Sequence, residues 1–150
     1  MVINRIQTLF LILAAAVMVV FFFVPFGYEV TTDQLTGASA LNPLRAVDIA
    51  GLIVPTAVSI GLLVVAIFLF KKLSVQKLIT VLAGVAVGVC IISVIYILVA
   101  GMSDTNPDVA LSTTWGGGGI MLIAALAAII AAYRGMSHDQ RLLSSADRLR

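Results

Sequence analysis

The stretch between Lys77 and Asp104 reads LITVLAGVAVGVCIISVIYILVAGMS and contains no charged residue over 26 positions. An α-helix rises about 1.5 Å per residue, so about 20 apolar residues cross a hydrocarbon core about 30 Å thick. The stretch is therefore long enough to form a transmembrane helix. Three further uncharged windows of similar length occupy residues 6–28, 49–70 and 109–133.

The composition of the whole chain agrees with this interpretation. Of its 150 residues, 61% are hydrophobic and only 11% are charged, and the mean hydropathy is +1.17. Soluble domains have about 45–50% apolar and about 25% charged residues. We therefore predict one all-α domain, residues 1–150, built as a four-transmembrane-helix bundle. The expected spans are 6–27, 49–70, 78–101 and 113–133, with outer loops 28–48 and 102–112.

The positions of the basic residues predict an orientation. Eight of the nine Lys and Arg residues lie at the N-terminal end, in the 71–77 connection or after Tyr133. Short loops rich in Lys and Arg stay in the cytoplasm. The first apolar run continues through Phe23. It is longer than the apolar core of a signal peptide, which has about 7–15 residues, so we expect it to be retained as a membrane anchor. The sequence thus predicts a multi-pass membrane protein with both termini cytoplasmic.

Small residues at four-residue spacing are candidates for helix packing, because they let helix backbones approach closely in a bilayer. The candidates are Ala57, Gly61, Gly84, Gly88, Ala124 and Ala128. We expect these stripes to face the interior of the bundle, and an interface with another chain is the alternative.

Proline and glycine mark two special places in the chain. Pro55 lies inside the second span and predicts a kink near Gly51, with Thr56 and Ser59 positioned to satisfy the freed carbonyls. Four consecutive glycines, 116–119, precede the fourth span, and they predict a flexible or closely packed helix start.

No set of residues in the sequence points to catalysis. None of the four uncharged windows contains an ionisable carboxylate or base, which is the usual mark of a proton relay or ion path. Cys90 lies in the middle of a span, and His138 is the only histidine. We therefore predict no catalytic, cofactor-binding or metal-binding residues, and the protein is not expected to be an enzyme. The net charge of +2 is too small to indicate a nucleic-acid partner.

The C-terminal tail shows a helical pattern of its own. Ser137 and Gln140 fit a capping box, with Asp139 and His138 as a solvated pair near the helix start. Apolar residues then recur at helical spacing up to Leu149. The pattern predicts a short cytoplasmic amphipathic helix, residues 137–150, lying on the inner leaflet or against the 71–77 connection, or docking a partner.

A weak internal repeat relates the first and third spans. Four residues recur at a constant offset of 69: Gln7, Leu9, Leu13 and Ala14 match Gln76, Leu78, Leu82 and Ala83. Both spans start in the cytoplasm, so a parallel repeat of two helical hairpins is expected. In the outer loop, residues 30–32 are typical of extended chain and 35–37 of a turn, which predicts a small hairpin.

Three motifs resemble a known family. They are RIQTLFLILAA at residues 5–15, FLFKK at 68–72 and SADRLR at 145–150. Together they are similar to a family of bacterial membrane proteins, the domain of unknown function numbered 4293, known mainly from Bacteroidetes. The resemblance covers the whole chain and implies a four-helix inner-membrane protein, without implying an activity or a cofactor.

The first and last motifs are expected at the same membrane face. Their polar residues are Arg5, Gln7, Asp147, Arg148 and Arg150. We hypothesise that the tail folds back so that Asp147 pairs with Arg5 or with a lysine of the 71–77 connection.

These observations favour a non-enzymatic accessory or scaffold subunit of a membrane complex. Its expected partners are the lipid bilayer and other inner-membrane proteins or further copies of the chain, with no nucleic acid. The alternative is a small oligomeric transporter or channel for a neutral or apolar substrate, with a cavity near Pro55.

Overall fold

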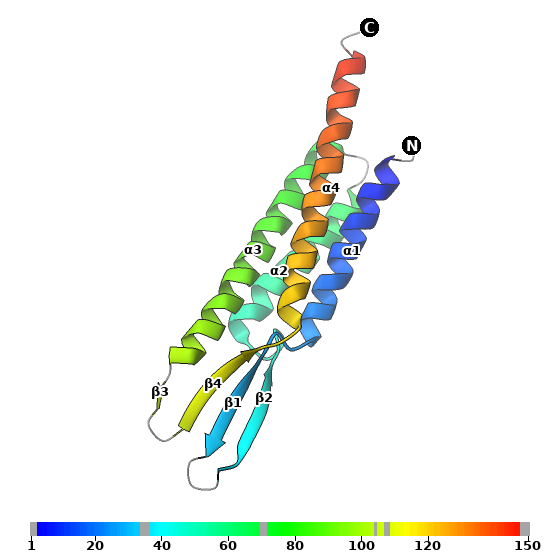
Figure 1. Ribbon diagram of the computed structural model, residues 1–150. Helices are drawn as coiled ribbons and strands as arrows, with labels where there is room; N and C mark the ends of the chain where they lie inside the picture. Colours follow the sequence, from blue (N-terminus) through cyan, green and yellow to red (C-terminus); the bar gives the residue numbers. More distant parts are fainter. Residues whose placement is uncertain (1–2, 34–36, 70–71, 104, 107–108, 148–150) are drawn as a thin grey trace.

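The computed structural model describes residues 3–33, 37–69, 72–103, 105–106 and 109–147. Its main body is an antiparallel bundle of four helices (Figure 1). They are α1 (Ile3–Phe23), α2 (Ala50–Phe68), α3 (Leu73–Ser103) and α4 (Gly118–Asp147). Both chain termini lie at one end of the bundle, here called the terminal end.

A four-stranded antiparallel sheet extends from the opposite end, here called the sheet end (Figure 1). Its strands are β1 (Gly27–Asp33), β2 (Ser39–Leu44), β3 (Thr105–Asn106) and β4 (Val109–Trp115), in the order β2-β1-β4-β3. Thr31 of β1 pairs with Ala40 on one side and with Leu111 on the other. On the β2 edge, Pro43 pairs with Tyr28.

The sheet corrects the predicted all-α class, because the chain is mostly helical but not entirely so. The hairpin expected between residues 28 and 48 is present as β1 and β2. The second connection, 102–112, was expected to be a loop, yet β4 pairs along the whole of β1. An isolated two-stranded hairpin is marginally stable, and joining two connections into four strands satisfies more backbone groups.

Several helix boundaries differ from the predicted spans. The third helix begins at Leu73 rather than at residue 78, so Lys77 lies in a helix. The first helix ends at Phe23 because Pro25 cannot continue it. The fourth begins at Gly118, because residues 109–115 form β4. The fourth helix then runs without a break to Asp147, so the separate tail helix predicted for 137–150 is wrong. Met136 is fully buried and holds this part of α4 against the bundle.

Each helix carries a window long and apolar enough to cross a membrane. The windows are Ile6–Phe23, Ala50–Phe68, Leu73–Ala100 and Gly118–Leu142. Only 28–33% of the residues in each window are buried inside the protein, so most of their apolar side chains face outward. Helices that are apolar on all sides are typical of membrane-spanning bundles.

The burial of matched residues agrees with the predicted parallel repeat. Gln7 and Gln76 are each 3% exposed, and the paired alanines at 14 and 83 are fully buried. By contrast, Leu9 and Leu78 are 62% and 61% exposed. Residues at the offset of 69 thus occupy equivalent positions, with α1 between α2 and α4 and α3 between the same two helices.

Two glycines join the sheet to the bundle. The Gly116 and Gly118 amides donate hydrogen bonds to the carbonyls of Phe26 and Pro25, at 2.7 and 3.1 Å. A Cβ atom on either glycine would lie 2.8 Å from backbone atoms of Pro25 or Phe26. At Gly117 a Cβ would meet nothing within 4 Å. The glycine run therefore provides close packing at two of its positions.

Replacing either packed glycine by alanine should destabilise the protein. We expect Gly116→Ala and Gly118→Ala to lower the free energy of unfolding by about 1–3 kcal/mol each, because backbone must move to admit the methyl group. Gly117→Ala and Gly119→Ala are matched controls, since a Cβ there meets nothing within 4 Å. Thermal unfolding in mild detergent compares the four variants, and four equal melting temperatures would contradict the packing role.

Candidate functional site

A layer of buried polar side chains lies near the terminal end of the bundle. Gln7 of α1 donates from Nε2 to the Asp139 carboxylate of α4. Gln76 of α3 donates from Nε2 to the Ala66 carbonyl of α2, at 3.1 Å. Each glutamine of the repeat therefore links one pair of helices through its Nε2 donor. Gln7 links α1 to α4, and Gln76 links α3 to α2.

Asp139 is buried because α4 continues through the tail. It follows Ala132 and Met136 at helical spacing, and both of those are fully buried. The expectation of a solvated Asp139 beside a helix start is wrong, since the residue is 8% exposed in the middle of a helix. A buried carboxylate is costly unless it is hydrogen-bonded, and Gln7 supplies one donor. Within the described residues, Oδ1 of Asp139 has no partner.

Gly135 makes room for the Gln7 side chain. A Cβ atom at Gly135 would lie 3.0 Å from Cγ of Gln7. Next to this contact is a small groove of about 170 Å³. It is lined by Ile6, Gln7, Phe10, Ala131, Gly135, His138 and Asp139. Gly135 is related to Ala66 by the repeat offset of 69, so a small residue meets each glutamine.

The Gln7–Asp139 contact should stabilise the folded bundle. We expect Gln7→Leu to lower the free energy of unfolding by about 1–3 kcal/mol, because it leaves a buried carboxylate without its donor. Gln7→Leu combined with Asp139→Leu should recover part of that loss. Asp48→Asn, at an exposed position, is the control for a change of charge. Purely additive losses in a double-mutant cycle would show that the two side chains are not coupled.

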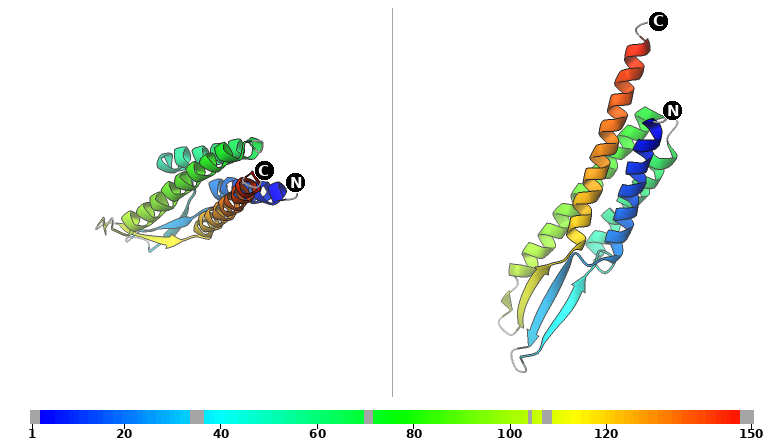
Figure 2. Two further views of the ribbon diagram at one scale, coloured as in Figure 1. Left: turned by 90° about the horizontal axis from the view of Figure 1, so that it is seen from above. Right: turned by 45° about the vertical axis from the view of Figure 1, so that its right-hand side comes forward.

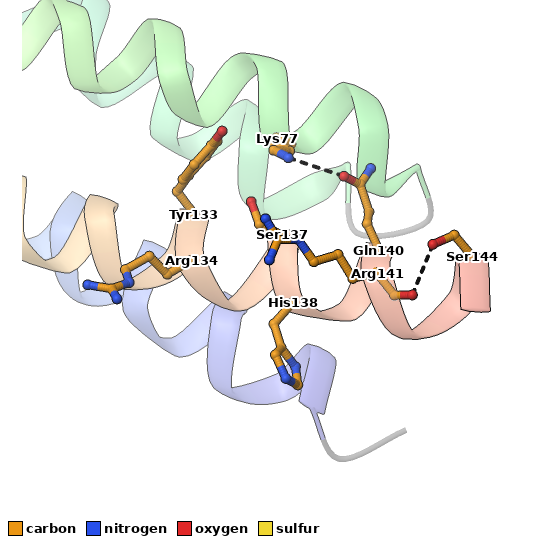
Figure 3. A pocket seen from close by; sticks show the side chains of 8 residues that line it. All are labelled: Lys77, Tyr133, Arg134, Ser137, His138, Gln140, Arg141 and Ser144. Atoms are coloured by element: carbon orange, nitrogen blue, oxygen red, sulfur yellow. Dashed lines mark hydrogen bonds between the residues drawn. The ribbon is translucent and has the colours of Figure 1, made fainter. Parts of the chain in front are cut away.

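A larger basic groove of about 880 Å³ lies on the other side of α4 (Figure 3). It is lined by Lys77, Tyr133, Arg134, Ser137, His138, Gln140, Arg141 and Ser144. The lining contains three positively charged residues, Lys77, Arg134 and Arg141. It also contains His138 and no acidic residue. In Figure 3 the Arg141 guanidinium is turned back toward Ser137.

Lys77 is held in place across the seam between α3 and α4. Its Nζ lies 5.0 Å from the centroid of the Tyr133 ring, a cation–π distance. The same Nζ donates to Oε1 of Gln140 at 3.3 Å, and Nε2 of Gln140 donates to the Ser74 hydroxyl at 3.3 Å. These contacts fix the ammonium group at the edge of the basic groove (Figure 3).

An apolar groove of about 150 Å³ adjoins the basic one along the same seam. Its lining is Thr80, Val81, Gly84, Leu126, Ile129, Ile130 and Tyr133. Tyr133 belongs to both linings, so the two grooves meet at its ring. Sequence reasoning did not find this site, because its residues come from two helices whose relative rotation is set by packing.

The interior near Pro55 is filled by side chains. Thr56, Ser59 and Cys90 are fully buried, with the Thr56 hydroxyl 3.7 Å from the Cys90 sulfur. Ser59 donates to the Pro55 carbonyl at 2.7 Å. The prediction that Ser59 satisfies the carbonyl freed near Gly51 is therefore wrong, because Ser59 bonds the Pro55 carbonyl instead. Pro55 lines none of the three grooves described above.

The predicted packing stripes have mixed positions. Ala57, Gly61 and Ala124 are exposed, so the expected interior position is wrong for these three. The interior face of α2 instead carries Thr56, Ser59 and Leu63, because buried hydroxyls find partners there. Ala128 is buried, and Gly84 and Gly88 are partly buried. A Cβ at Gly84 would lie 3.4 Å from Cγ2 of Ile129, so this glycine brings α3 close to α4.

Comparison with protein families identifies the chain. The sequence model of the family described as "Domain of unknown function (DUF4293)" matches residues 3–149. The chain belongs to the DUF4293 family. No curated protein matches its sequence. The match covers both the bundle and the sheet. The residues that line the grooves therefore lie within the region that defines the DUF4293 family.

The remaining end-motif residues of this DUF4293 protein fall largely outside the described side chains. Arg5 and Asp147 belong to α1 and α4, but their side chains are not among those described, and Arg148 and Arg150 lie outside the described residues. The hypothesised pairing of Asp147 with Arg5 or with a lysine of the 71–77 connection therefore falls on side chains outside those described, and α4 itself runs as one helix to Asp147. In the described parts of the chain, no group of three metal-ligating side chains occurs.

Proposed function

We propose that this DUF4293 protein is a multi-pass protein of a bacterial inner membrane, with the terminal end in the cytoplasm. The resemblance noted above suggests a Bacteroidetes source. Support comes from the charges at the two ends of the bundle. Lys77, Arg134 and Arg141 lie at the terminal end, whereas the sheet end carries Arg45. Basic residues concentrate on the cytoplasmic side of membrane proteins.

This orientation predicts which positions a membrane-impermeant maleimide can reach. The chain contains one cysteine, and Cys90 is buried, so labelling of the native chain should be low. Ser39→Cys on β2 should label in intact spheroplasts, and Ser145→Cys on α4 should label only after permeabilisation. Both serines are exposed, so they are matched in accessibility. The reverse pattern would place the terminal end outside.

Within the membrane, we propose that the protein acts as a non-enzymatic accessory or scaffold subunit of a complex. The observation that carries this proposal is the continuation of α4 past the rest of the bundle (Figure 2). On this extension Arg141, Leu142, Ser144 and Ser145 are exposed. These side chains add nothing to the protein's own core, and a rigid protruding helix can present them to a partner in the cytoplasm.

The outer face of α2 offers a second contact surface inside the membrane. Ala57 and Gly61 are exposed there, and a Cβ at Gly61 would meet nothing within 4 Å. Small residues on a lipid-facing surface allow the backbone of another helix to approach closely. This surface suits a helix of a partner subunit or of a second copy.

Gentle-detergent purification from native membranes tests the scaffold role. The native chain, tagged at its N-terminus, should return a stoichiometric partner. Leu142→Asp should reduce the retained partner about tenfold, because a charge replaces an exposed apolar contact on the protruding helix. Leu41→Asp on β2 is the matched control, since this leucine is also exposed but lies at the sheet end.

Two other outcomes would contradict the scaffold role. A chain that returns as a single copy without any partner, from native membranes, would remove the basis for a subunit. A chain that returns only as a homo-oligomer would favour the alternative, a small transporter or channel for a neutral or apolar substrate.

A further inference from the structure

We infer that the seam between α3 and α4 binds one anionic phospholipid of the inner leaflet. The lipid phosphate would lie in the basic groove, and an acyl chain would lie along the adjoining apolar groove. This inference rests on the membrane orientation proposed above, but it does not depend on the scaffold role.

The two grooves together have the polarity of a phospholipid. One lining carries Lys77, Arg134 and Arg141 with no acidic residue, and the other is apolar except for the hydroxyl groups of Thr80 and Tyr133. Tyr133 belongs to both linings and marks the change from one to the other. Tyrosine is enriched at the level of lipid headgroups, where its ring is apolar and its hydroxyl is polar.

The donors of the basic groove match a phosphate group. The Lys77 ammonium carries three protons, and the described contacts use it towards Gln140 and the Tyr133 ring, so it retains capacity to donate. The Arg141 guanidinium is turned toward Ser137 (Figure 3). The Ser137 hydroxyl oxygen is buried and has no partner within the described part of the chain. A phosphate in the groove can accept from the Lys77 ammonium and the Arg141 guanidinium.

The apolar groove has the form of a shallow channel for a chain. Gly84 lies in its lining, at a point where α3 approaches Ile129 of α4 closely. Val81 and Ile130 stand at its margins, and they are 42% and 50% exposed. An acyl chain lying here would cover these side chains along the direction of the helices.

Only an anionic lipid uses both halves of the seam. A free phosphate would use the cations but leave the apolar groove empty, and a zwitterionic lipid would use the apolar groove with less gain from the cations. Basic pockets between transmembrane helices on the cytoplasmic side are suited to anionic headgroups, to which each basic residue contributes attraction.

Native mass spectrometry of the delipidated, purified chain tests the headgroup part. Phosphatidylglycerol and phosphatidylethanolamine with identical acyl chains are the two probes. The native chain should bind phosphatidylglycerol more tightly, and Lys77→Gln with Arg141→Gln should weaken that binding about thirtyfold. The matched control is Lys72→Gln with Arg45→Gln, because both residues are exposed and outside the groove. Equal affinity for the two lipids, or equal losses in the two double variants, would overturn the inference.

A second pair of variants tests the acyl-chain part. Val81→Phe fills the apolar groove and should weaken binding of phosphatidylglycerol, while Val85→Phe, one helical turn along and outside the lining, should not. Both valines are exposed, so neither change should disturb the core. Millimolar inorganic phosphate should not displace the lipid. Displacement by phosphate together with no effect of Val81→Phe would assign the groove to a free anion instead.

The experiment separates this inference from the proposals that precede it. It uses the purified chain without any partner, so the scaffold role can fail while lipid binding persists. The maleimide labelling of Ser145→Cys tests the orientation independently.

Discussion

Two of the four pairs of adjacent helices, α1 with α4 and α2 with α3, are each joined near the terminal end by a buried glutamine. Lipid tails are as apolar as leucine, so the hydrophobic effect gives helices in a bilayer little reason to associate, and hydrogen bonds and close packing take its place. Gln7 holds α4 through Asp139, and Gln76 holds α2 through the Ala66 carbonyl. The first of these contacts keeps α4 on the bundle well beyond Tyr133, and the position of the basic groove depends on it.

The two halves of the repeat bury equivalent residues, but their second helices, α2 and α4, end at different positions. Both run as helix, hairpin and helix, and residues at the offset of 69 have similar burial. The helix α2 ends at Phe68, whereas α4 continues beyond the equivalent position to Asp147. That additional length supplies Arg141 of the basic groove and the exposed extension. Part of the surface proposed here as functional therefore belongs to the segment that breaks the repeat.

The sequence predicts the four helices well, because each is encoded by a long uncharged window. For the glycine run, the sequence left two alternatives open, a flexible helix start or a closely packed one. Gly116 and Gly118 are closely packed. The sheet was only partly foreseen, since pairing between the two connections depends on contacts distant in sequence. The interior face of α2 was misassigned, because in lipid an alanine such as Ala57 is equally acceptable inside and outside. Asp139 was misplaced because a charged residue in a tail usually indicates solvent, and its burial depends on α4 continuing unbroken.

The edges of the sheet limit how the outer part of the molecule can assemble. Pro43 on β2 has no backbone N–H to donate to an added strand, and β3 at the other edge contains only two residues. The β2 edge is therefore a poor template for pairing with a strand from another chain. With the orientation proposed above, a protein that approaches the β2 edge from outside the membrane would contact side chains rather than add a strand, so neighbouring copies are protected from strand exchange at this edge.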